Sequence, residues 1–139
     1  MMSTTELSPD VVFHPSPRLF VWKPPGSLNE TAVNKIIAFV AKQEAASNQP
    51  FLRFADLTGL DQVELNFNFV FQISLHRRIT YSGHPATKSA FLVTSLEAEH
   101  YAKLHAMLTD YSPLEVAVFE DRGAAAKWLG VLPELLQMP

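Results

Sequence analysis

Three acidic side chains and a hydroxyl group gather in one short stretch of the chain. Asp56, Asp61 and Glu64 flank Thr58 in "DLTGLDQVE", which directly follows the apolar run "FLRFA". Ligands of open α/β sheets bind beyond the carboxyl ends of parallel strands, so this stretch, together with Asn66, is our first candidate for a partner or ligand surface. The competing interpretation is structural: Asp61 and Glu64 form a helix-capping box, and Asp56 bonds to its own turn.

The residue pattern gives little support for a metal site or for catalytic residues. His100 and His105 share a predicted helix, but five positions place them about 140° apart, so they cannot form a two-histidine ligand set on one face. The acidic stretch lacks EF-hand spacing, and the chain contains no cysteine, no G-x-S-x-G motif and no phosphate-binding glycine loop. We therefore predict no metal site, no catalytic residue, no cofactor and no enzymatic activity.

A basic cluster, "LHRRIT", gives a further alternative. It brings His76, Arg77 and Arg78 to the end of a predicted helix. Cations are favourable at helix C-termini in any case, and a phosphate or carboxylate pocket at this point is the functional alternative.

The amino-acid composition and net charge restrict the possible classes of protein. The chain has 139 residues, of which 47% are hydrophobic, and this suits a single domain with one core. Its net charge of −3 disfavours nucleic acid as a partner. The first residues show no secretory signal, and no apolar run reaches the roughly 18 residues of a membrane span, so we expect a cytoplasmic protein.

The elements that must position these residues follow from local patterns. Runs rich in β-branched and aromatic residues predict strands at 11–14, 18–23, 51–57, 88–95 and 114–121. Helical spacing of apolar residues predicts helices at 28–47, 62–79, 95–108 and 122–131. The capping boxes that support the first three helices begin at Ser27, Asp61 and Thr94, and Asp121 and Gly130 bound the last helix.

The resulting order is β-β-α-β-α-β-α-β-α. It predicts an α/β fold with a mixed, mostly parallel sheet of about five strands and helices packed on it. Residues 62–79 alternate like a strand, but two neighbouring parallel strands need a crossover between them, which favours a helix. We expect residues 1–10 to be a disordered tail, 11–131 a single domain and 132–139 a C-terminal tail.

The predicted helix 62–79 carries aromatic residues on two faces. If Val63, Phe67, Phe71 and Leu75 face the sheet, another element, an apolar ligand or a second subunit must cover Phe69 and Ile73. Of these we favour a homodimer.

Three segments resemble the STAS domain (sulfate transporter and anti-sigma-factor antagonist), and in particular small stand-alone bacterial proteins with a STAS-like, lipid-carrier-like fold. They are "FADLTGLDQVELNF", "KSAFLVTSLEAEHYAKL" and "LEVAVFEDRGAAAKWLG", and the resemblance spans about residues 18–131.

The resemblance implies a regulatory role without a phosphorylation switch. Phospho-regulated members carry Asp-Ser-Ser-Gly before this helix, where the present chain has Glu64, Leu65, Asn66 and Phe67. Neither Leu nor Asn offers an oxygen nucleophile, and Thr58 is the nearest alternative hydroxyl.

Two functions remain open from the sequence. The first is a non-catalytic regulatory module that presents residues 56–66 to a protein partner or to a second copy. The alternative is a carrier of a small apolar or lipid-like ligand, with a cavity lined by Phe69, Phe71 or Ile73.

Overall fold

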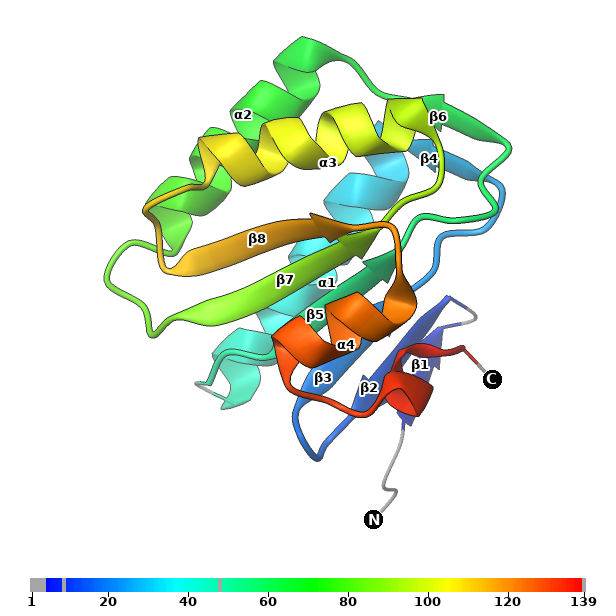
Figure 1. Ribbon diagram of the computed structural model, residues 1–139. Helices are drawn as coiled ribbons and strands as arrows, with labels where there is room; N and C mark the ends of the chain where they lie inside the picture. The colour runs from blue at the N-terminus through cyan, green and yellow to red at the C-terminus, as the bar shows by residue number, and fades with distance from the viewer. Residues whose placement is uncertain (1–4, 9, 48, 139) are drawn as a thin grey trace.

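A mixed six-stranded sheet forms the centre of the molecule, which is described here from a computed structural model covering residues 5–8, 10–47 and 49–138 (Figure 1). Its strand order is β1-β2-β3-β5-β7-β8. The strands are β1 (Thr5–Ser8), β2 (Val11–His14), β3 (Leu19–Trp22), β5 (Leu52–Asp56), β7 (Thr87–Leu92) and β8 (Leu114–Phe119). β1, β2 and β3 pair antiparallel, whereas β3, β5, β7 and β8 pair parallel, which confirms the predicted mixed, mostly parallel sheet.

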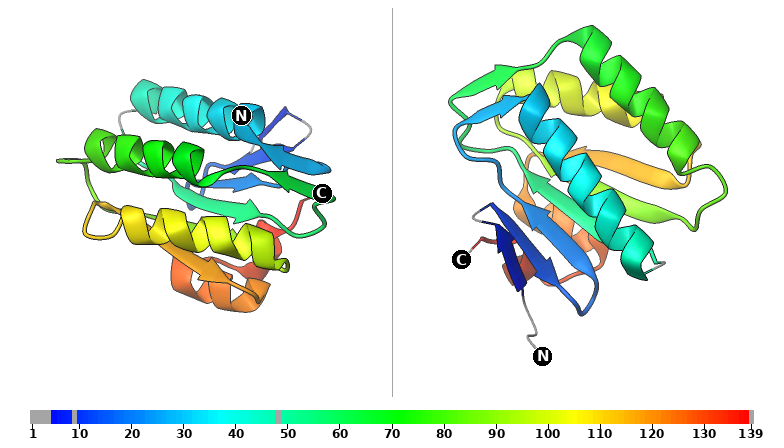
Figure 2. Two further views of the ribbon diagram at one scale, coloured as in Figure 1. Left: turned by 90° about the horizontal axis from the view of Figure 1, so that it is seen from above. Right: turned by 180° about the vertical axis from the view of Figure 1, so that it is seen from behind.

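Helices cover both faces of this sheet. One face carries α1 (Glu30–Ser47), α2 (Phe67–Thr80) and α3 (Leu96–Leu108), and the other carries α4 (Arg122–Leu129) with the 3₁₀ turn η1 (Pro133–Leu136) (Figures 1 and 2). In the described residues, none of these helices combines the length and the apolar character needed to cross a bilayer.

The start of α2 differs from the prediction. Gln62–Glu64 forms a short strand, β6, which pairs parallel with β4 (Ser27–Asn29) in a separate two-stranded ribbon. The predicted helix 62–79 therefore begins only at Phe67, and its N-cap is Asn66, whose side chain accepts a hydrogen bond from the Phe69 amide at 2.9 Å. Residues 62–64 adopt an extended conformation because they pair with a distant segment of the chain. The local capping pattern could not reveal this pairing.

The same ribbon moves the start of α1. Asn29, rather than the predicted Ser27, caps this helix by accepting a bond from the Ala32 amide at 2.9 Å. The Ser27 hydroxyl instead donates to the Glu64 carboxylate at 2.8 Å, across the two strands. A similar shift of one residue places the cap of α3 on Ser95 instead of Thr94.

Both predicted tails include residues that the structure describes. Residues 1–10 were expected to be a disordered tail; within them Thr5–Ser8 forms the edge strand β1, and residues 1–4 and 9 lie outside the described part. Residues 132–139 were expected to be a C-terminal tail, and within them Leu136 is fully buried, in a cluster with Leu129 of α4. Residue 139 lies outside the described part.

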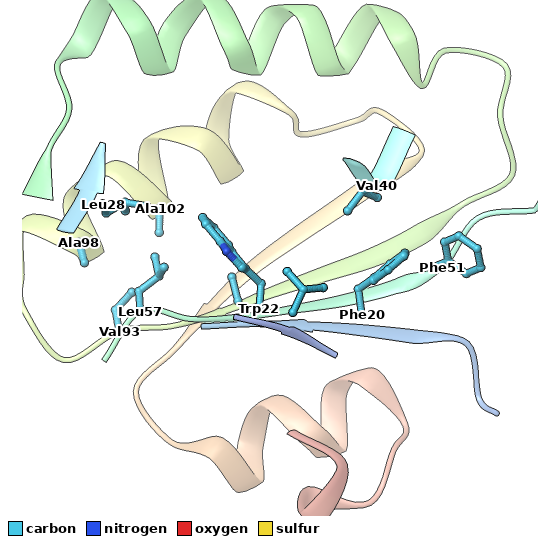
Figure 3. Close-up of a cluster of buried hydrophobic side chains, with 11 residues drawn as sticks. Phe20, Trp22, Leu28, Val40, Phe51, Leu57, Val93, Ala98 and Ala102 are labelled. Carbon is cyan, nitrogen blue, oxygen red and sulfur yellow. The ribbon is translucent and has the colours of Figure 1, made fainter. Parts of the chain in front are cut away.

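The larger hydrophobic core lies between the sheet and the three helices α1–α3. Figure 3 shows Phe20 and Trp22 standing up from the sheet into the space below the helices, towards Val40 and Ala102. Phe20 and Phe51 meet edge to face with ring centroids 5.0 Å apart, a favourable geometry for aromatic pairs. This core also borders the cavity described below.

Candidate functional site

The acidic connection after β5 is built around a buried carboxylate. Asp56 is 2% exposed and accepts hydrogen bonds from Arg122 at 2.8 Å and from the Thr58 hydroxyl at 2.5 Å and amide at 3.0 Å. Lys23 lies 3.4 Å from the same carboxylate. Burial acts to raise the pKa of Asp56, but these hydrogen bonds and the charge of Lys23 together hold the pKa below its ordinary value. Asp56 thereby ties together β3, β5 and α4.

Of the other predicted site residues, Thr58 contacts Asp56, whereas Asp61, Glu64 and Asn66 make their hydrogen bonds elsewhere. The Thr58 hydroxyl also accepts a bond from Lys23 at 3.2 Å, so its bonds are used within the turn. Asp61 is exposed, and its amide donates to the Gly26 carbonyl at 2.6 Å. Glu64 is bonded across the β4–β6 ribbon, and Asn66 caps α2. These bonds are structural ones, and no group of three acidic or histidine side chains among the described residues could share a metal ion.

An apolar cavity of about 130 Å³ lies between the sheet and the helices α1, α2 and α3. Its floor includes Trp22 of β3 and Phe91 of β7, and Ile36 of α1 forms part of its wall. Phe69 and Ile73, predicted to form a dimer or apolar-ligand face, both line this cavity from α2.

The face of α2 that was expected to face the sheet points outward in the structure. Phe67 is 55% exposed, and Phe71 and Leu75 are also exposed. The packing of α2 against α3 determines which face of α2 points outward. The face bearing Phe69 and Ile73 consequently turns inward.

One end of the cavity is polar and carries a buried arginine. Arg53 of β5 is 7% exposed and pairs with Glu44 of α1 at 2.5 Å. Its Nη2 atom also donates to the Tyr81 hydroxyl, which in turn donates to Glu44 at 2.8 Å. Burial, the largest influence, raises the pKa of Tyr81, so its phenol stays protonated at neutral pH.

Arg77 of α2 approaches the same end of the cavity and contacts His105 of α3. The Arg77 Nη1 atom lies 3.0 Å from His105 Nε2, and Ser74 Oγ lies 2.7 Å from His105 Nδ1. Burial lowers the pKa of Arg77 to about 10, helped by the like charge of Arg53, so Arg77 remains protonated at pH 7. Burial and the two arginines lower the pKa of His105 well below its ordinary value, and its ring is neutral.

The Ser74–His105 pair is arranged unlike a nucleophile and its base. A guanidinium only donates hydrogen bonds, so His105 Nε2 must accept from Arg77 and the ring proton must be on Nδ1. That proton points to Ser74 Oγ, and the imidazole cannot take the serine proton in this tautomer. Ser74 is also fully buried.

Sequence reasoning identified only some of the residues that line the cavity. Arg77 was considered for an anion pocket with His76 and Arg78, but only Arg77 reaches the cavity. Arg53 and Glu44 were not identified as site residues. Arg53 itself was the available signal, because it is a charged side chain within the otherwise apolar run 51–55. A buried charge requires a partner, so its position indicated a polar cluster in the core.

Known proteins resemble the chain in tertiary structure rather than in sequence. No family model matches the chain, and no curated protein matches it. Among solved structures, it is similar to an uncharacterized protein of the DUF3478 family with a SpoIIAA-like fold from Shewanella loihica PV-4. The two chains share 19% sequence identity with a TM-score of 0.49, over 93% of this chain and 95% of the other.

Proposed function

We propose that this protein is a non-catalytic module that binds a small apolar molecule in the cavity between the sheet and α1–α3. The observation that carries the proposal is the cavity of about 130 Å³ with a predominantly apolar lining. Transfer of apolar surface from water to an apolar contact is favourable. An apolar ligand that covers this lining would therefore gain binding free energy.

The volume limits the size of the ligand. An engineered apolar cavity of about 150 Å³ in another protein holds benzene, so the apolar part of the ligand here has about six carbon atoms. A long-chain lipid would not fit without movement of α2. The proposal therefore narrows the predicted apolar or lipid-like ligand to a small compound.

Binding of 1-hexanol, measured by isothermal titration calorimetry and thermal unfolding, tests the proposal. Binding to the folded state alone raises its stability by about 2.7 kcal/mol at a hundredfold excess over Kd, and the melting temperature rises accordingly. Native mass spectrometry of the protein purified from its own cells would show a co-purifying compound. The proposal would be contradicted if neither 1-hexanol nor another six-carbon probe binds or raises the melting temperature.

A cavity-filling variant supplies the control. Ala102 lines the cavity from α3, so Ala102→Leu places three additional carbon atoms in it and should abolish binding. Ala106→Leu makes the same change on the same helix away from the cavity and should leave binding unchanged. Circular dichroism would establish that both variants are folded.

A second function, association with a protein partner or a second copy, is supported by the outward face of α2. Phe67, Phe71, Leu75 and Ile79 recur every four residues, and all four are exposed, Ile79 by 74%. The Phe67 and Phe71 rings stack with centroids 5.7 Å apart. Exposed apolar stripes of this kind mark interaction surfaces.

Sedimentation analysis over a range of concentrations tests self-association, and the double variant Phe67→Ser, Phe71→Ser should remove it. Leu96→Ser, at an exposed position of α3, is the matched control. A wild-type monomer at all concentrations would exclude the predicted homodimer and leave only a different protein partner. The predicted cytoplasmic location rests on the sequence, and cell fractionation would check it.

A further inference from the structure

The cavity described above is apolar except at one end, where two arginines from different elements line it. Arg53 reaches the cavity from β5, and Arg77 reaches it from α2. The apolar walls and the two guanidinium groups thus border the same cavity. A ligand that fills this space would contact both kinds of surface.

The hydrogen-bonding capacity of Arg53 is only partly used. Its Nη2 atom donates to Glu44 and to Tyr81, whereas its Nε and Nη1 atoms are buried without a hydrogen-bond partner among the described residues. A guanidinium has five N–H donors, and leaving buried donors unsatisfied is unfavourable. A ligand with acceptor oxygen atoms would satisfy them.

The charge balance at this end of the cavity indicates the charge of such a ligand. Glu44 is paired with Arg53, and Tyr81 and His105 are neutral at pH 7. The Arg77 Nη1 atom contacts the neutral imidazole of His105, and its guanidinium lies 6.0 Å from the centroid of the Tyr81 ring. Two guanidinium groups and one carboxylate leave the cluster with one excess positive charge. A single negative charge would balance the cluster, whereas a phosphate dianion would exceed it.

From this geometry we propose that the ligand is a small apolar monocarboxylic acid, whose carboxylate binds Arg53 and Arg77 while its hydrocarbon part fills the cavity. The inference rests on the proposed ligand-binding function and names its substrate class. Paired guanidinium groups suit a carboxylate because planar N–H forks match its two oxygen atoms. The competing explanation is that the arginines only hold the three helices together, in which case the ligand's charge would not matter.

Calorimetry with hexanoate and 1-hexanol at pH 7 tests the inference. The two probes have six carbon atoms each and differ only in the head group. We expect hexanoate to bind at least about tenfold more tightly, because charge-assisted hydrogen bonds are about twice as strong as neutral ones. The thermal shift produced by hexanoate should exceed that of 1-hexanol at equal concentration.

Arg77→Met is the first variant, because Arg77 contacts a neutral histidine and its removal leaves no buried charge unpaired. It should weaken hexanoate binding by about tenfold or more and leave 1-hexanol binding within about twofold. Arg78→Met removes the same charge from an exposed neighbour that contacts the Leu108 and Asp110 carbonyls instead, and should change neither affinity.

A second variant does not depend on Arg77. The double substitution Glu44→Gln, Arg53→Gln removes both charges of the buried pair together, so neither partner is left uncompensated. It should also abolish the preference for hexanoate.

The outcomes separate the two proposals. Equal or tighter binding of 1-hexanol would overturn the carboxylate inference and leave the proposed function standing. A hexanoate preference that survives in both arginine variants would likewise overturn it. If neither probe binds, the proposed function fails and the inference with it.

Discussion

Replacing Asp56 by alanine should destabilise the fold without affecting the cavity. The Asp56 carboxylate is buried where β5 ends and joins three parts of the chain through Thr58, Arg122 and Lys23. Its removal leaves two cations and the hydrogen-bond donors of Thr58 without their acceptor. The expected result is a large loss of stability with normal binding of 1-hexanol.

The magnitude follows from the bonds that are lost. The two bonds from Thr58 contribute roughly 1 kcal/mol each, and the charge-assisted bond from Arg122 contributes about 1.5 kcal/mol. The Lys23 contact is long, and its side chain is 40% exposed, so it contributes a few tenths of a kcal/mol at most. We expect Asp56→Ala to lower the free energy of unfolding by about 3.5 kcal/mol, towards the low end for a broken buried ion pair.

Urea denaturation followed by circular dichroism at pH 7 measures this loss. With an m-value near 2 kcal/mol/M, the midpoint should fall by about 1.8 M urea. Asp61→Ala, an exposed acid in the same connection, is the matched control and should change stability by less than about 0.5 kcal/mol. The reasoning is refuted if the two variants lose similar stability, or if Asp56→Ala loses less than about 1 kcal/mol.

Three further predictions concern other parts of the fold. His105 is neutral when folded, so the stability that it contributes is present above its unfolded pKa near 6.5 and declines as the pH falls below it, by up to about 1.4 kcal/mol per pH unit. Wild-type and His105→Gln unfolding curves between pH 7 and 5 should therefore converge on acidification, and parallel curves would contradict this. Asp121→Ala should cost about 1 kcal/mol, because Asp121 caps α4 through the Ala124 amide, whereas Glu120→Ala should have little effect in the same urea assay. Leu136→Ala should cost about 2 to 5 kcal/mol and Leu132→Ala less than about 0.5, and equal losses would exclude the C-terminal turn from the core.

Local signals predicted the elements whose boundaries depend on local interactions. Asp121 caps α4 and Gly130 ends it in a left-handed conformation with φ of 77°, as the sequence indicated. The same type of signal gave the wrong start for α2. Asp61 and Asn66 are both acceptable N-caps, and capping differs between such residues by about 1 kcal/mol or less. The choice of Asn66 follows from the pairing of Gln62–Glu64 with Ser27–Asn29, which the local sequence does not encode.

The sequence itself determined the order of the four helices and the five longer strands, the mixed sheet and the apolar character of α2, because these arise from neighbouring residues and from side-chain periodicity. The direction in which α2 presents its aromatic residues was decided only by its packing on α3. Tertiary structure also decided the polar end of the cavity, where Glu44, Arg53, Arg77 and His105 meet from four different elements. Contacts between residues so far apart in the chain depend on how helices settle on the sheet, and no local pattern specifies that geometry.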